Sequence, residues 1–388
     1  MIENPLFYLF TLAFIATFFY FLESKTELKF FKYIPAVVII YAVSMFLASF
    51  HVFDTNAEIT AIYKRVKENL LPAMLFLMLL HVDIKEFLKL GKPLFQAYLL
   101  ALFSLVIAFV SIAYIFNFSA TTAAAFGALA GSWMGGTANM IAVGSALNVP
   151  EEAFAYALVV DSVNYTLWVM LLLFAVPLAP LFNTFTKAKS SGVKMGDIGC
   201  ACRLGTKRYW SLLLLSIFIS FLCNFAANTF FIEFSHTTTI VLLATLFGIV
   251  GSFTKLKEFN GSSEVATSML YILVALIGSR AVIESFSGLG IYVLAGFSIL
   301  VVHMLIMIIG AKILHLDLFS ISVASLANIG GVVSAPILAA TYNNSLVGVG
   351  VLMAIMGYLI GTFGGLLASL LMKLAHLIPK FDFTTLYI

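Results

Sequence analysis

The sequence has 388 residues, of which 62% are hydrophobic and only 10% are charged. A soluble domain of this length could not hide so much apolar surface in one core, so lipid must cover much of it. The formal net charge is +3, and the Lys and Arg residues concentrate in short loops, which is typical of membrane orientation and does not indicate nucleic-acid binding. The composition therefore predicts a multi-pass α-helical protein of the cell membrane, with the lipid bilayer as its main partner.

Hydropathy predicts twelve apolar segments, and a helix needs about 20 apolar residues to cross a bilayer. In chain order they are 5–22, 34–51, 69–82, 93–117, 121–148, 152–182, 209–232, 237–253, 264–280, 289–312, 318–343 and 345–374. The first segment follows no basic region and precedes no cleavage motif, so we expect a retained helix. The longest polar stretch divides six segments from six. We therefore expect a first transmembrane repeat at 1–182, a cytoplasmic linker at 183–208 and a second repeat at 209–388.

The fifth segment of each half carries a Gly pair among small and hydroxylated residues. A shift of 195 residues superimposes Gly135 and Gly136 on Gly330 and Gly331. Glycine in a helix interior costs about 1 kcal/mol per residue relative to Ala, so the recurrent pair predicts a helix break. Unwound backbone at membrane depth must be buried in protein or line a watery cavity. The alternative is close packing of small residues between ordinary helices.

The distribution of positive charge favours a re-entrant hairpin at this break. If the first hairpin returns to its own side, 12 Lys and Arg residues of that half lie inside and three lie outside; a full crossing gives nine and six. Re-entry leaves five crossings per half, an odd number, so the second half is inserted upside down. We therefore expect an all-α polytopic membrane protein of two inverted repeats, each with about five transmembrane helices plus one broken or re-entrant Gly-Gly helical hairpin.

The two Gly-Gly segments, GSWMGGTAN and LANIGGVVSAP, also carry a family resemblance. They resemble the paired signatures of the YjcL-like family of bacterial membrane proteins, which has no assigned function and is grouped with cation:proton antiporters and anion transporters. More distantly, the chain is similar to sodium-coupled glutamate and citrate symporters, whose two Gly-Gly hairpins carry substrate and sodium in an elevator movement. The resemblance implies coupled transport of a small anion. The chain departs from the antiporters because no Asp-Asp or Asn-Asp pair lies in a predicted membrane helix.

Asp161 is the carboxylate that lies deep within a predicted membrane helix, nine residues and about 14 Å beyond Glu152. Asn164 and Tyr165 follow at i+3 and i+4 and share its face. A buried acid in lipid costs several kcal/mol unless it is paired, protonated or bound to a cation. We expect these three residues to hold the coupling ion, Na⁺ or H⁺. The alternative is an acid that is hydrogen-bonded to Asn164 only for packing.

The hairpin tips supply the candidate substrate ligands. Backbone N–H groups at helix N-termini favour anions, whereas unwound carbonyls and side-chain oxygens suit Na⁺. The candidate residues are Ser132, Gly135, Gly136, Thr137, Asn139, Asn328, Gly330, Gly331 and Ser334. No cofactor or metal other than Na⁺ is expected.

Three further features are open to two interpretations each. Arg280, at a helix end, is either a membrane-interface anchor or a group that approaches an anionic substrate. His303 lies in the middle of the tenth segment and is either structural or a proton relay. The spacing of Gly357, Gly361 and Gly365 indicates tight helix packing or the face of a homodimer, which is the oligomer we expect.

The duplicated pattern with a single acid favours a secondary active transporter of a small organic solute. The resemblance implies that this solute is an anion such as a carboxylate, an amino acid or a small peptide. The alternatives are a cation:proton antiporter and a passive channel. An enzyme is not expected, because neither an H-E-x-x-H motif nor a rhomboid-like serine motif occurs.

Overall fold

A computed structural model describes residues 1–25, 36–80, 90–188, 206–229, 236–258, 261–280, 288–343 and 346–376. Within these ranges the fold is helical, apart from one isolated bridge between Ile2 and Phe53. The α-helices are α1 Pro5–Lys25, α2 Ala36–Ser49, α3 Ala57–Leu79, α5 Lys92–Ile115, α6 Ala120–Gly135, α7 Thr137–Ala146, α8 Glu151–Ala175, α9 Ala179–Thr186, α10 Thr206–Thr229, α11 His236–Ser252, α12 Ser262–Gly278, α13 Leu289–Leu314, α14 Leu318–Ile329, α15 Gly331–Tyr342 and α16 Val347–His376.

Six helical stretches in the described part of the chain are long and apolar enough to cross a membrane: Pro5–Glu23, Lys92–Ile115, Glu151–Thr186, Arg208–Thr229, Leu289–Leu314 and Val347–Ala375. Their outward faces are apolar, as in α1, where Phe7, Phe10 and Phe14 are all more than half exposed. Such faces would be unfavourable in water and are solvated by lipid tails. The chain is therefore a multi-pass membrane protein, as the composition predicted.

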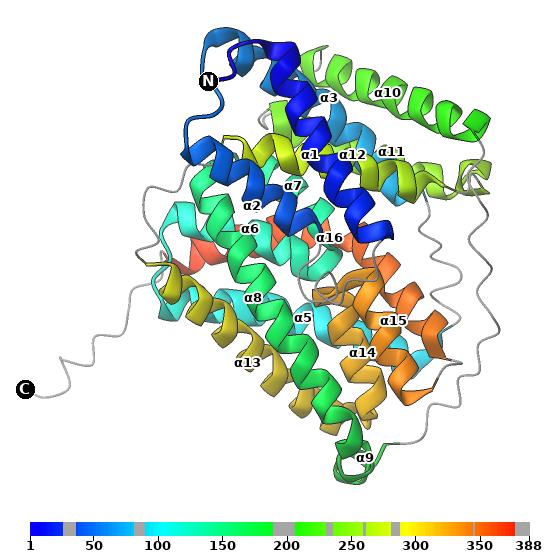
Figure 1. The fold of residues 1–388 in the computed structure, drawn as a ribbon. Coiled ribbons are helices and arrows are strands. Elements are labelled where there is room, and N and C mark those ends of the chain that lie inside the picture. Colours follow the sequence, from blue (N-terminus) through cyan, green and yellow to red (C-terminus); the bar gives the residue numbers. More distant parts are fainter. Residues whose placement is uncertain are drawn as a thin grey trace, which may run out of the picture.

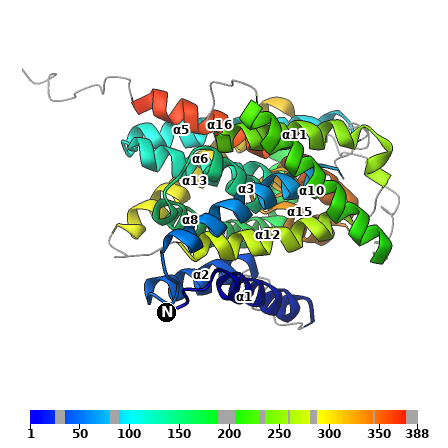
Figure 2. The same cartoon turned by 90° about the horizontal axis from the view of Figure 1, so that it is seen from above.

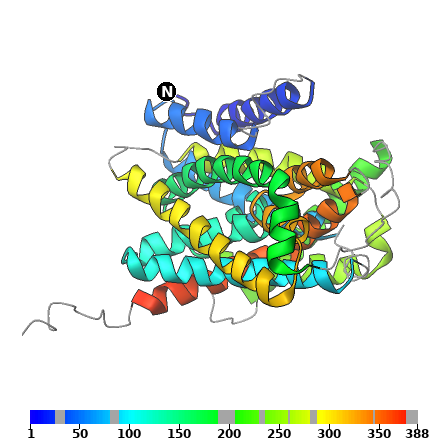
Figure 3. The ribbon, with the colours of Figure 1, turned by 90° about the horizontal axis from the view of Figure 1, so that it is seen from below.

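The helices form two groups, both of which draw on both halves of the chain (Figure 1). The first helix group contains α1, α2 and α3 together with α10, α11 and α12, and its members pack on one another. The second helix group contains α5 to α9 together with α13 to α16. Figures 2 and 3 show the same arrangement from above and from below. Helix α7 contacts α3 and α11, so it lies at the boundary between the groups.

Both Gly pairs interrupt a helix, as the sequence predicted. Gly136 separates α6 from α7 and has φ +83°, and Gly331 begins α15 with φ +67°. Both values lie in the left-handed region, which glycine enters without the steric cost of a Cβ atom. Each broken helix has two arms: α6 and α7 in the first half, α14 and α15 in the second. The first arm of each begins at a side-chain cap. Ser119 Oγ accepts a hydrogen bond from the N–H of Thr122 in α6, and Asp317 Oδ1 accepts one from the N–H of Ser320 in α14.

The two arms of each broken helix lie side by side. In the first pair, a Cβ added at Gly131 of α6 would lie 2.9 Å from Cγ2 of Val143 in α7. In the second pair, the rings of Phe319 and Tyr342, at the far ends of α14 and α15, stand 5.4 Å apart. In each pair, the residues that approach one another stand on opposite sides of the break and at similar distances from it along the chain, so the second arm lies alongside the first.

Helices α6 and α16 approach until their backbones touch. A Cβ added at Gly361 of α16 would lie 2.6 Å from Cα of Gly135, and one added at Gly365 would lie 2.9 Å from Cα of Gly131. Glycines spaced by four residues on both helices permit this approach. The glycines of α16 therefore serve tight packing within the chain, and α6 covers the face that was also considered for a dimer.

One expected segment boundary was wrong. Helix α3 begins at Ala57 rather than at residue 69, because Asn56 accepts a hydrogen bond from the N–H of Ile59 and caps a charged but helical first part. The segment expected at 152–182 lies within the helical stretch Glu151–Thr186, in which a short 3₁₀ turn with Pro177 separates α8 from α9. Most of the expected linker, residues 189–205, lies outside the described residues.

The contact between α6 and α16 yields a stability prediction. Gly361→Ala should force the two backbones apart and lower the free energy of unfolding by about 1–3 kcal/mol. The matched control is Gly290→Ala, because a Cβ at Gly290 would meet no atom within 4 Å. Thermal unfolding of the purified protein in detergent measures both. A midpoint for Gly361→Ala equal to that of Gly290→Ala would contradict the close approach.

Candidate functional site

Asp161 lies in the middle of α8 and is held by the first broken helix. Its Oδ2 accepts a hydrogen bond from Ser132 Oγ at 2.8 Å, and its Oδ1 accepts one from Trp133 Nε1 at 2.8 Å. Both donors belong to the last turn of α6, just before the break at Gly136. The carboxylate predicted from sequence therefore lies beside the first Gly-Gly element, one helical turn before its tip.

The partners of Asp161 leave its charge uncompensated. Ser132 and Trp133 donate neutral hydrogen bonds, and no Lys or Arg pairs with the carboxylate among the residues the structure describes. The Asp161 side chain is half-buried, whereas Ser132 and Trp133 are buried. Each carboxylate oxygen retains a lone pair for a further ligand. A cation or a proton would supply the missing compensation.

The same face of α8 reaches the second broken helix. A Cβ added at Gly330 would lie 2.8 Å from Cε2 of Tyr165. The hydroxyl oxygen of Ser334 is also packed against Gly330. Tyr165 is one helical turn beyond Asp161, so α8 places an acid beside one break and a phenol beside the other. Asn328, one turn before the second break, is fully buried and its Oδ1 has no hydrogen-bond partner.

Both breaks are more exposed than the helical turns that precede them. Gly136 and Thr137 are half-buried, as are Gly330 and Gly331, whereas the last turns of α6 and α14 are buried. A Cβ at Gly331 would meet no atom within 4 Å, and one at Gly136 would lie 3.6 Å from a ring carbon of Tyr358. The second tip thus faces open space, with backbone groups that a ligand could reach.

Two predicted residues are engaged elsewhere. Asn164 turns away from Asp161 and donates to the carbonyls of Val160 and of Val293 in α13. Asn139 donates to the Gly135 carbonyl and accepts from Thr362 Oγ1 of α16 at 2.6 Å. Asn164 and Asp161 are therefore not brought together, and Asn139 ties the first tip to α16.

His303 is part of a buried polar chain that crosses four helices. Its Nε2 shares a 2.8 Å hydrogen bond with Ser325 Oγ of α14, and its Nδ1 shares a 2.7 Å bond with Ser104 Oγ of α5. Trp168 of α8 donates to the same Ser325 hydroxyl at 2.9 Å. The chain fixes the first arm of the second broken helix against its neighbours, which agrees with the structural interpretation of His303.

Sequence reasoning missed two contributors to this site. Trp133 donates to Asp161, but a tryptophan in an apolar helix gives no sign of its partner. The stripe of Gly127, Gly131 and Gly135 in α6 has a spacing of four, which could have revealed the face that meets α16. Over the described residues, no cluster of three or more His, Cys, Asp or Glu side chains could hold a metal ion.

The model of one protein family matches residues 10–374, nearly the whole chain. The chain belongs to the DUF819 family of proteins of unknown function. The expectation of an uncharacterised family that covers nearly the whole chain is thereby confirmed, and the matched range contains both Gly-Gly breaks as well as Asp161. No curated protein matches this DUF819 member.

The donors around Asp161 yield a second prediction. Ser132→Ala leaves a carboxylate oxygen without its donor and should cost about 1–3 kcal/mol of stability. In an Asp161→Ala background, Ser132→Ala should lower the free energy of unfolding much less, because the carboxylate that accepts the Ser132 hydrogen bond has already been removed. Thermal unfolding in detergent gives this double-mutant cycle, with Ser298→Ala as control because that hydroxyl only donates to the Leu294 carbonyl. Equal costs in both backgrounds would show that Ser132 and Asp161 are not coupled.

Proposed function

We propose that this protein is a secondary active transporter of a small organic anion, such as a carboxylate, an amino acid or a small peptide, coupled to Na⁺ or H⁺ and working in the cell membrane. One observation carries the proposal. Asp161, a membrane-embedded carboxylate, has neutral donors and no basic partner among the described residues, and it lies on a helix that contacts both broken elements. Broken helices that meet near the bilayer midplane are where secondary transporters bind substrate and coupling ions.

The coupling ion would bind at Asp161. An ionised carboxylate at this depth is costly without a partner, whereas Na⁺ or a proton neutralises it. Hard oxygen ligands are available from Asp161, from Ser132 and from the carbonyls at the breaks. Asn164 contributes to packing against α13 rather than to this shell. The substrate anion would meet backbone N–H groups at the tips beside Thr137 and Gly331.

The two halves are further proposed to be inverted repeats, each with a re-entrant Gly-Gly hairpin. The order of helices supports this, because a shift of 195 residues brings α5 onto α13 and α8 onto α16 to within a few residues. The side-by-side arms at both breaks support re-entry. An odd number of crossings per half then inverts the second half.

The division into two helix groups supports an elevator movement of the second group against the first. In the described part of the chain, side-chain hydrogen bonds link the groups at Thr238, whose Oγ1 donates to the Ala146 carbonyl, and at the hydroxyls of Tyr41 and Tyr63, which donate to Glu151. Single side-chain hydrogen bonds of this kind can break and form again with other partners when one group moves against the other. The backbone contact of α6 with α16 instead holds the second group together as one unit. A homodimer would use a surface other than the α16 glycines, which α6 covers.

Topology provides a direct test of the inverted repeats. Both Asn148 and Asn343 are exposed at the ends of the second arms. After replacement of the native cysteines by Ser, Asn148→Cys should react with a membrane-impermeant thiol reagent from outside and Asn343→Cys only from inside. Labelling of both positions from the same side would contradict the inversion.

A mutant test addresses the coupling role of Asp161. The transported solute is first identified by thermal shift with small carboxylates, amino acids and peptides, with and without Na⁺; a ligand at 100 times its Kd stabilises by about 2.7 kcal/mol. In proteoliposomes, Asp161→Asn should abolish accumulation of that solute against its gradient and remove the dependence of binding on Na⁺ or pH. Glu152→Gln, which removes an exposed carboxylate from the first turn of the same helix, is the matched control.

The outcome also separates the rival functions. Exchange of labelled for unlabelled solute shows a carrier, because a passive channel gives no counterflow. Uphill accumulation by Asp161→Asn at the level of the parent would contradict a coupling role for the acid.

A further inference from the structure

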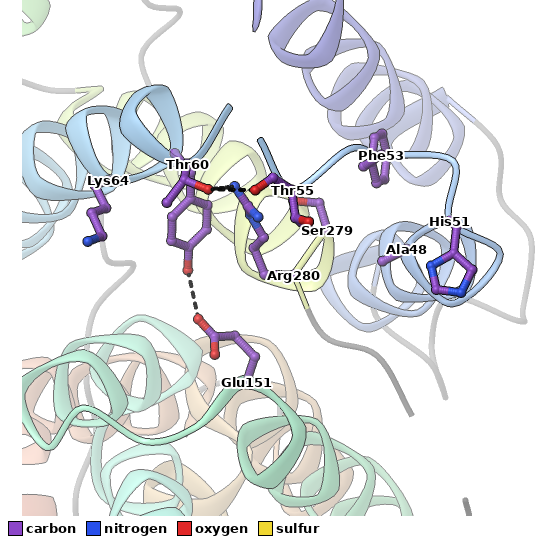
Figure 4. Close-up of a pocket in the computed structure, with 10 residues that line it drawn as sticks. Ala48, His51, Phe53, Thr55, Thr60, Lys64, Glu151, Ser279 and Arg280 are labelled. Carbon is purple, nitrogen blue, oxygen red and sulfur yellow. Dashed lines mark hydrogen bonds between the residues drawn. The ribbon is translucent and has the colours of Figure 1, made fainter. Parts of the chain in front are cut away.

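A cavity lies where α8 begins, at the boundary between the two helix groups, about 15 Å along the helix from Asp161. Its volume is about 330 Å³. It is lined by Ala48, His51, Phe53, Thr55, Thr60, Tyr63, Lys64, Glu151, Ser279 and Arg280, which Figure 4 shows as sticks. A cavity of this size accommodates a small organic molecule. None of these residues belongs to the site around Asp161.

Arg280 points into this cavity and has no acidic partner among the described residues. Its Nη2 donates to Thr60 Oγ1 at 3.1 Å, and its guanidinium carbon stands 5.2 Å from the ring centre of Tyr63. Its Nε is buried and makes no hydrogen bond. A guanidinium that stacks on a ring at the wall of a cavity, without a paired carboxylate among the described residues, can bind a planar anion.

The remaining charges of the cavity leave it with an excess of positive groups. Lys64 lies on its wall with Arg280, against the single carboxylate of Glu151. That carboxylate is engaged, because Glu151 Oε1 accepts from the Tyr63 hydroxyl at 3.3 Å. Glu151 therefore binds a tyrosine rather than Arg280, and the guanidinium retains its capacity for an external anion.

We propose that this cavity is an entry site that binds a small carboxylate through Arg280 before it reaches the broken helices. The proposal rests on the proposed transport of a small anion and names the class of group, a carboxylate, by which the anion is recognised. The planar guanidinium fits a carboxylate with two parallel hydrogen bonds, and Lys64 adds attraction at the mouth of the cavity. The location at the start of α8 places the entry site on the helix that carries Asp161.

Binding measurements on the purified full-length protein test the entry site. Calorimetric titration with succinate, glutamate and acetate should show saturable binding of at least one of them to the parent. Arg280→Gln should weaken that binding tenfold or more, which is the scale of a lost charge-assisted pair. Arg65→Gln is the matched control, because it removes the same charge from an exposed position on α3 that does not line the cavity.

Two further variants test whether the carboxylate binds in this cavity. Ala48→Leu should weaken binding by filling the cavity while leaving Arg280 in place. Ser298→Ala, which removes a hydroxyl that donates to the Leu294 carbonyl away from the cavity, should leave the affinity within twofold of the parent. The proposal is overturned if none of the three carboxylates binds the parent, if Arg280→Gln binds as tightly as Arg65→Gln, or if inorganic phosphate binds more tightly than the carboxylates. Binding that depends on Arg280 in a protein without counterflow would support the entry site and contradict the transporter.

Discussion

The backbone contact between α6 and α16 is the constraint on which the candidate site depends. Where Gly135 meets Gly361 there is no room for a side chain on either helix, so the first broken helix and the last long helix are fixed as one body. This body presents Ser132 and Trp133 to α8 at a defined place, and Asp161 receives both of their hydrogen bonds. Close packing of small residues, which in lipid substitutes for the hydrophobic effect between helices, thus sets the position of the one acid.

Helix α8 then connects the parts of the molecule that a coupled transporter must connect. Its first turn meets the first helix group through Glu151, its middle carries Asp161, and the next turns reach the second broken helix through Tyr165 and Trp168. The first Gly of each pair is enclosed, Gly135 by α16 and Gly330 by Tyr165 and Ser334, whereas the second Gly has more room, most of all Gly331. A ligand that binds both tips and Asp161 would stabilise one relative position of these elements, which is the thermodynamic requirement for coupling.

Features that depend on local chemistry were predictable from the sequence. The helices, the breaks at both Gly pairs and the place of Asp161 in the middle of a long helix follow from hydropathy, from glycine and from helix geometry. Features that depend on a partner far along the chain were not: Trp133 as a donor, the turning of Asn164 towards α13, and Arg280 in a cavity. Spacing places side chains on a face of a helix but does not identify the helix opposite that face.

The central claim is that a cation or proton moves into the membrane and binds at Asp161. Transient currents on a solid-supported membrane measure this without knowledge of the transported solute. A jump in Na⁺ concentration or in pH should displace charge in the parent and in Glu152→Gln, and Asp161→Asn should show no displacement. An unchanged current in Asp161→Asn, or the absence of charge movement in the parent under both jumps, would contradict the account.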